Sequence, residues 1–595
     1  PSASSGTVLL SNVSCRRRRS LDGPWRYIVD PYDLGYVDIL TRRNRQGFYR
    51  DHKPRHRGDR VEYDFDRSGE LQVPGDWNTQ DPTLHYYEGT VWYRTIVEVA
   101  ADDPAADSAN RTFVHVGAAN HTARVFLDGE ELACHVGGYG PFAVEVTGRL
   151  DPGPHSLILQ VNNRRESDRV PAMRSDWWNF GGLHRSVDLV TVPPVFLRDA
   201  WVTMDADGAL VAGATVDAHT DTPAAVSVEL IDLGLTIDLE PVVGTPGEFA
   251  ARTDADVERW HPGRPVLHRV RWRCVSGAGD AAAVDTFDDE VGFRTVAVDG
   301  NRILVNGEPT FLRGISIHGE GPSGGRRASG PDDAGTLLDW AVDLGANFVR
   351  LAHYQHDEHM VREADRRGLL AWCELPVYWN IAWDDPRVLD NALAQADELV
   401  VRDRSRASVA LWSVANETLP GEGRHEFLGA LVDRVRRLDP TRLVSGALIT
   451  LPTGGLDFSA DDEFGSILDV VAINQYLGWY YGERHEIPLA TFTTPWGKPI
   501  LFSELGAGAK HGLHGDDDEI WTEEFQAAVY RAQLEMIRRQ PDCAGLSPWI
   551  LKDFRTPLRV LPDVQDGYNR KGLVSEEGER KLAFDVVADA YRDLA

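Results

Sequence analysis

The stretch Val409-Ala410-Leu411-Trp412-Ser413-Val414-Ala415-Asn416-Glu417 decides how the second half of the chain is interpreted. Its first seven residues form a largely apolar run that is typical of a buried strand, and the stretch ends on a carboxylate. A second run, residues 499–503, is followed directly by Glu504. Two acidic residues at the ends of two buried strands predict general acid/base and nucleophilic chemistry.

Strand-like and helix-like segments alternate around these two runs, from residue 295 to the end of the chain. An amphipathic stretch at 524–538 places apolar residues on one helical face. Eight strands in this rhythm predict a (β/α)8 TIM barrel, with Glu417 after the fourth strand and Glu504 after the seventh, both at the carboxyl-terminal rim. The predicted strands are 311–316, 347–352, 369–375, 409–415, 443–448, 470–476, 499–503 and 544–550.

The part of the chain before residue 295 has a different pattern, in which short alternating runs are separated by turn residues. This pattern predicts two β-sandwiches, the first jelly-roll-like and the second immunoglobulin-like. Pro193-Pro194 marks the boundary between them. We therefore predict three domains: a sugar-binding-like sandwich at 1–193, an immunoglobulin-like sandwich at 194–294 and the barrel at 295–595.

The composition bounds the function. A formal net charge of −30 argues against binding to nucleic acid or to anionic membranes, and no apolar run is long enough to span a bilayer. The five cysteines form no CxxC pair, which predicts free thiols in a reducing compartment and favours the cytoplasm. The chain begins at Pro1, so a removed leader peptide stays open as an alternative.

Several motifs resemble one known family. Trp412–Glu417 and Phe502-Ser503-Glu504 resemble the acid/base and nucleophile motifs of glycoside hydrolase family 2. Tyr87-Glu88-Gly89-Thr90-Val91-Trp92-Tyr93 and Asn179-Phe180-Gly181-Gly182-Leu183-His184-Arg185 resemble signatures of its first domain. The resemblance spans the whole chain. It implies a retaining glycosidase in which Glu417 is the general acid and base and Glu504 is the nucleophile.

The resemblance also implies roles for residues around the two carboxylates. Asn416 is expected to bind the 2-hydroxyl of the sugar, and Tyr476 is expected to hydrogen-bond the nucleophile. Trp549 is expected to form an apolar floor under the sugar ring. The remaining residues expected to bind substrate are Asp176, His318, His353 and Tyr480.

The segment Tyr568-Asn569-Arg570-Lys571-Gly572 points to the sugar. It resembles the Asn-x-Lys motif with which the β-glucuronidases of this family hold the substrate carboxylate, so Asn569 and Lys571 are expected to bind a terminal β-linked uronic acid. This sequence departs from the β-glucuronidase pattern at one position. The pattern has an arginine a few residues before Asn569, whereas here Gln565 stands nearest to that place and Arg555 and Arg559 lie earlier in the chain. A β-galacturonidase therefore stays open.

Other functions also stay open. A β-galactosidase of the same family is the neutral-sugar alternative, a transglycosylase would use the same residues, and a non-catalytic carbohydrate-binding protein is the alternative from another class. We expect no cofactor and no metal site. The expected partner is a carbohydrate substrate, and the family resemblance is compatible with a homodimer or homotetramer.

Overall fold

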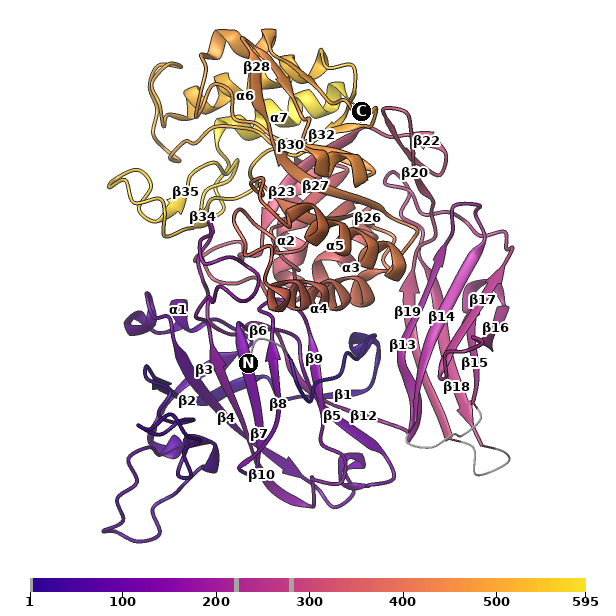
Figure 1. The fold of residues 1–595 in the computed structure, drawn as a ribbon, viewed down its shortest axis with the longest axis vertical. Helices are drawn as coiled ribbons and strands as arrows, with labels where there is room; N and C mark the ends of the chain where they lie inside the picture. Colours follow the sequence, from indigo (N-terminus) through magenta and orange to yellow (C-terminus); the bar gives the residue numbers. More distant parts are fainter. Residues whose placement is uncertain (1–3, 219–223, 278–282, 595) are drawn as a thin grey trace.

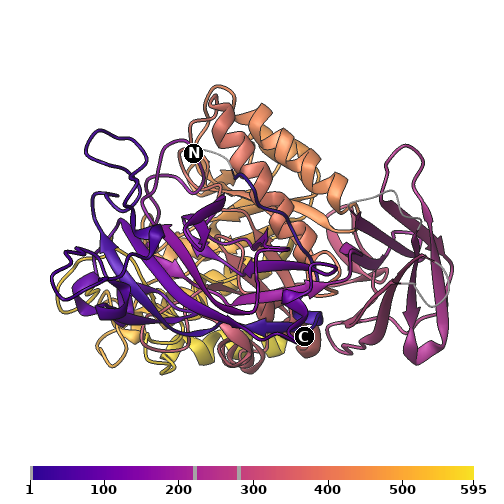
Figure 2. The same ribbon diagram turned by 90° about the horizontal axis from the view of Figure 1, so that it is seen from below.

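Three regions of different architecture follow one another in the computed structural model, which describes residues 4–218, 224–277 and 283–594. In Figure 1 the N-terminal β-sandwich lies below the C-terminal barrel, and a second β region lies to one side of both. Figure 2 shows the same arrangement from below, with the sandwich in front of the barrel. Within the described residues, no helix has the length and apolar character needed to cross a bilayer.

In the first region, a four-stranded and a six-stranded antiparallel sheet enclose an apolar core. Trp25 and Tyr93 from one sheet and Leu189 from the other are buried in it. The one-turn α-helix α1 (Trp77–Gln80) and several 3-10 turns interrupt the β pattern. The first sheet has the order β1 (Arg18–Ser20), β12 (Val187–Val192), β5 (Arg111–Val116) and β9 (Phe142–Glu145). The second has the order β3 (Gly69–Val73), β2 (Gly23–Asp30), β4 (Thr90–Val99), β10 (Gly153–Asn162), β7 (Thr122–Leu127) and β8 (Glu130–Val136).

The second region is a seven-stranded antiparallel sheet that curls around its own core. Along β18 buried and exposed side chains alternate, because one face of the strand packs inward and the other faces water. Trp272 and Phe287 are among the buried residues. The strand order is β13 (Val195–Met204), β14 (Leu210–Ala218), β17 (Glu248–Thr253), β16 (Leu235–Pro241), β15 (Ala224–Leu230), β18 (His268–Ser276) and β19 (Ala283–Val291).

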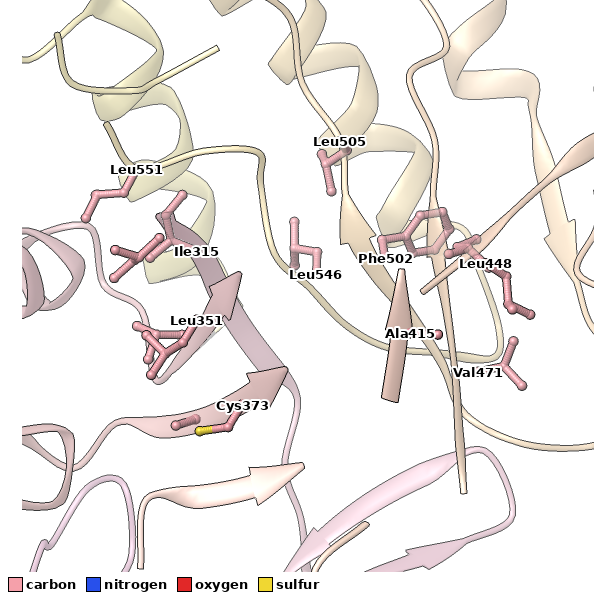
Figure 3. Close-up of a cluster of buried hydrophobic side chains, with 14 of the residues drawn as sticks. Ile315, Leu351, Cys373, Ala415, Leu448, Val471, Phe502, Leu505, Leu546 and Leu551 are labelled. Atoms are coloured by element: carbon pink, nitrogen blue, oxygen red, sulfur yellow. The ribbon is translucent and has the colours of Figure 1, made fainter. Parts of the chain in front are cut away.

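The third region contains a closed barrel of eight parallel strands, as the sequence predicts. Its strands are buried on both faces, which explains their nearly continuous apolar runs. The strands are β23 (Leu312–His318), β24 (Phe348–Ala352), β25 (Leu370–Glu374), β26 (Val409–Asn416), β27 (Leu443–Ile449), β30 (Val470–Asn474), β32 (Ile500–Glu504) and β33 (Cys543–Leu546). Figure 3 shows side chains from these strands that belong to one buried apolar cluster.

The helices around the barrel depart from a regular (β/α)8 pattern. The described long helices are α2 (Gly330–Asp343), α3 (Glu358–Arg367), α4 (Pro386–Asp403), α5 (Arg424–Leu438), α6 (Glu523–Arg538) and α7 (Leu582–Asp593). The connections after β27 and β30 instead contain 3-10 turns, η8 (Glu463–Ile467) and η9 (Arg484–Leu489). Glycines and a proline in these connections, including Gly478, Gly482 and Pro488, disfavour a longer helix.

The sandwich meets the barrel at the carboxyl-terminal rim. Tyr139 and Trp177 of the sandwich belong to the same buried aromatic cluster as Tyr378, Tyr476 and Trp549 of the barrel. Because the active sites of such barrels lie at this rim, the first domain can contribute directly to the site.

Candidate active site

Glu417 follows β26 directly, at the rim of the barrel. Its backbone is left-handed (φ 49°), and so is that of Trp379 (φ 57°), a conformation that non-glycine residues adopt rarely and mostly where their surroundings hold them. Trp379 Nε1 donates to Glu417 Oε2 over 2.8 Å, and Asn474 Nδ2 donates to Oε1 over 3.1 Å. Burial, followed by the nearby Glu504 carboxylate, raises the pKa of Glu417 above its ordinary value.

Glu504 is the last residue of β32, and its side chain is buried. Arg350 Nη1 donates to Glu504 Oε1 over 2.8 Å, and Tyr476 Oη donates to Oε2 over 2.6 Å. His353 Nε2 lies 4.0 Å from Oε1. Both carboxylate oxygens therefore have strong donors, one of them a full positive charge.

Arg350 connects this carboxylate to a third acid that the sequence analysis does not include. It lies in the middle of β24, is fully buried, and pairs with Glu374 at the end of β25. Burial alone would raise the pKa of Glu374, but Arg350 and then His353 outweigh it and hold that pKa at about 2. A buried guanidinium between two carboxylates is fully paired and fixes the position of both acids.

Two asparagines link the surroundings of the two glutamates. Asn416 Oδ1 accepts from Arg350 Nη2 over 2.7 Å and from Asn474 Nδ2 over 3.1 Å. Asn416 Nδ2 is buried and has no hydrogen-bond partner among the described residues. Because buried polar atoms are rarely left unpaired, this donor is a candidate for contact with a ligand.

Aromatic rings form a wall beside the carboxylates. The Trp549 ring is stacked on His353 with ring centroids 4.8 Å apart, and His318 meets Trp549 edge to face at 5.2 Å. His353 Nδ1 bonds Glu374 Oε1 over 2.7 Å, and His318 Nδ1 bonds the hydroxyl of Tyr354 over 3.0 Å. An aromatic wall of this kind suits the apolar face of a sugar ring.

A second polar cluster lies on the other side of Tyr476. Lys571 Nζ donates to the Tyr480 hydroxyl over 2.6 Å and lies 5.0 Å from the centroid of the Tyr476 ring. Arg559 Nη2 donates to the same Tyr480 hydroxyl over 3.1 Å. Two cations thus converge on one hydroxyl next to the tyrosine that binds Glu504. A pocket of about 320 Å³ opens here, lined among others by Trp479, Tyr480, Arg559, Gln565, Asn569 and Lys571.

Asp176 of the sandwich orients this cluster. Its carboxylate accepts from Arg559 Nη2 over 2.9 Å, from Asn569 Nδ2 over 3.2 Å and from the Thr556 hydroxyl over 2.6 Å. Lys571 N in turn donates to Asn569 Oδ1 over 3.2 Å. The sandwich therefore positions residues of a barrel loop, and Arg559 shares the pocket with Gln565.

The contacts above connect all eleven residues predicted from the sequence into one site. They also add residues that the sequence analysis does not place there: Arg350, Glu374, Trp379, Asn474 and Arg559. A carboxylate at a strand end marks Glu374 in the same way as Glu504, so that pattern could have identified it. Within the described residues, no group of three or more His, Cys, Asp or Glu side chains is arranged to hold a metal ion.

Comparisons with known proteins place the chain in a family. Residues 296–568 match the TIM barrel domain of glycosyl hydrolases family 2, and residues 18–193 match the sugar binding domain of the same family. A β-glucuronidase of Paenibacillus borealis is 27% identical over 97% of each chain. The human β-glucuronidase is 26% identical over 98% of this chain and 91% of its own.

Solved structures show the same fold. The β-D-glucuronidase of Dictyoglomus thermophilum superposes with a TM-score of 0.78 at 22% identity, covering 98% of both chains. The β-glucuronidase of Ruminococcus gnavus in complex with D-glucuronic acid has a TM-score of 0.80 at 20% identity, covering 98% of this chain and 99% of its own. With both family domains matched in their expected order, the chain belongs to glycoside hydrolase family 2.

Proposed function

We propose that the protein is a retaining, exo-acting β-glucuronidase. It removes a terminal β-linked glucuronic acid by double displacement, with Glu417 as acid and base and Glu504 as nucleophile. The environments of the two carboxylates support these roles. Arg350 and Tyr476 compensate negative charge on Glu504. Among the described residues, the donors to Glu417 are the neutral Trp379 and Asn474, and its pKa is raised.

In the first step, the Glu504 carboxylate attacks the anomeric carbon while Glu417 gives its proton to the leaving oxygen. Glu417, now ionised, then accepts a proton from the water that hydrolyses the glycosyl-enzyme. Asn416 Nδ2 is the free donor for the 2-hydroxyl, a contact that strengthens in the transition state. Trp549 packs under the sugar ring in this arrangement.

One observation carries the choice of a uronic acid. Lys571 is only 4% exposed, yet it has no ion pair among the described residues of a chain with net charge −30. A buried ammonium without a counter-ion is costly, and the carboxylate of a bound uronic acid supplies the missing charge. Asn569 adds a neutral donor. Arg559 adds a second cation from a position six residues before Gln565.

The experiment compares nitrophenyl β-glucuronide, β-galacturonide and β-galactoside as substrates of the wild type and of Lys571→Ala. We expect the glucuronide to be preferred, and kcat/KM for it to fall by about 100-fold or more in the variant, because one partner of a buried charge pair is lost. Lys510→Ala is the matched control, since Lys510 belongs to a neighbouring loop and pairs with Asp566.

Two results would contradict the proposal. One is a wild-type preference for the galactoside. The other is an equal response of the Lys571 and Lys510 variants to the glucuronide. A preference for the galacturonide would keep the carboxylate site but change the sugar.

A further inference from the structure

A strongly basic segment stands out in the N-terminal sandwich of this acidic protein. Residues 41–60 contain eight arginines and lysines and only two aspartates, a net charge of +6 in a chain whose total is −30. The segment lies between β2 and β3 and far from residues 417 and 504 in the sequence. Its charge is not used by the site described above.

The segment is a projecting loop with a fixed base. Figures 1 and 2 show it as the indigo loop that extends away from the sandwich in both views. Its regular structure is limited to the 3-10 turn η2 (Phe48–Arg50). Phe48 and Tyr49 are buried in a cluster with Trp92 and Phe126 of the sandwich, so the base is anchored while the polar residues face outward.

Most of the cations in the loop have no acidic partner among the residues that the structure describes. Arg42, Arg43 and Lys53 form ion pairs with Asp38, Glu131 and Asp66. For five exposed arginines no ion pair is found within the described ranges: Arg45, Arg50, Arg55, Arg57 and Arg60. Like charges that are held close together attract a polyanion, because its binding relieves their repulsion and releases counter-ions.

The loop also encloses a hollow. A pocket of about 630 Å³ is lined by the cations Lys53, Arg55 and Arg60, by His52 and His56, by the acids Asp59 and Glu62, and by the Tyr63 ring. Tyr63 is 40% exposed, and its ring lies 3.8 Å from that of Phe48. An exposed aromatic ring among cations combines a platform for a sugar face with donors for its carboxylate.

We propose that this loop is a second carbohydrate-binding site, which holds an internal stretch of a linear uronic-acid polysaccharide. The loop lies inside residues 18–193, the part matched by the family's sugar binding domain. The inference rests on the proposed function, because a uronidase meets polymers that carry carboxylates. A polymer with widely spaced charges is also repelled less by the rest of the acidic surface than a nucleic acid is.

The test measures binding of a hyaluronan oligosaccharide, its methyl-esterified form and a single-stranded DNA of equal charge. The ligands are titrated at several salt concentrations against the full chain with Glu504→Gln, so that none is consumed. The test variant adds Arg55→Gln, Arg57→Gln and Arg60→Gln. The matched control instead adds Arg269→Gln, Arg271→Gln and Arg273→Gln, three exposed arginines of β18.

We expect the unesterified oligosaccharide to bind in a salt-dependent manner, and its affinity to fall about 10- to 100-fold in the loop variant but not in the control. The same triplets in the wild-type background should leave the hydrolysis of nitrophenyl β-glucuronide unchanged. Three results would overturn the proposal: an equal loss of affinity in the loop variant and the control variant, equal binding of the oligosaccharide and its methyl ester, or tighter binding of the DNA than of the oligosaccharide. If the wild-type protein does not hydrolyse nitrophenyl β-glucuronide at all, this result would instead count against the proposed function.

Discussion

Glu417 and Glu504 are the same residue type at the same rim, but the protein surrounds them differently. Glu504 is buried at the end of its strand and has an arginine and a tyrosine hydroxyl on its two oxygens. Glu417 is half-buried and follows its strand in a left-handed conformation. Within the described part of the chain, its hydrogen-bond donors are an indole and an amide. Glu504 is thus hydrogen-bonded by a positively charged side chain, whereas the hydrogen-bond donors to Glu417 are neutral.

In the proposed mechanism, this difference gives two identical side chains two different functions. A paired cation stabilises the negative charge that a carboxylate nucleophile carries, whereas burial beside another acid raises the pKa of a carboxyl group. Arg350 acts directly on Glu504, with which it pairs as it does with Glu374. Its link to Glu417 runs through the hydrogen bonds of Asn416 and Asn474.

The largest expected effect tests the Glu504 side of this comparison. Glu504→Gln keeps the shape of the side chain but removes the proposed nucleophile, so kcat should fall by about 10⁴-fold or more. Thermal unfolding should stay cooperative, which shows that the loss is chemical. Turnover above about one per cent of the wild type would show that Glu504 is not the nucleophile.

The proposed role of Glu417 is tested with substrates whose leaving groups differ in acidity. Glu417→Gln removes proton donation, which contributes about 10²- to 10⁴-fold. The first step should therefore slow strongly for an alkyl glucuronide and much less for a dinitrophenyl glucuronide, whose leaving group needs no proton. Pre-steady-state kinetics measure this step. An equal loss for both substrates would remove the distinction between the two acids.

A smaller effect concerns the hydrogen bond of Trp379. Its indole N–H lowers the pKa of Glu417 by stabilising the ionised form, against the larger raising effect of burial. The proposed first step needs Glu417 protonated, so activity should be lost as pH rises through this pKa. Trp379→Phe should therefore move the alkaline limb of the kcat/KM profile to higher pH.

Trp383→Phe is the control for that profile, because Trp383 packs against the Phe427 ring and makes no hydrogen bond to Glu417. If the alkaline limb of the kcat/KM profile stays in place in Trp379→Phe or moves to lower pH, a group other than Glu417 controls that limb.

The sequence predicts much of this arrangement, because strand-end acids and apolar runs are local patterns. The eight barrel strands and the pair Glu417 and Glu504 follow from such patterns. Arg350 could not be assigned in this way, since its partners come from other strands. The sequence shows Arg559 only as an arginine upstream of Gln565. Its contact with Asp176 could not be predicted, because the two residues lie 383 positions apart. The absence of long helices after β27 and β30 could have been predicted, because the connections that follow these strands contain glycines.

The assignment of different functions to the two acids is tested most directly by trapping the intermediate. A 2-deoxy-2-fluoro glucuronide with a good leaving group slows the second step, so the glycosyl-enzyme accumulates. Mass spectrometry of the digested protein should find the sugar on Glu504 alone and find no label in Glu504→Gln. A label on Glu417 would reverse the two roles, and a product of inverted configuration without any label would contradict the double displacement.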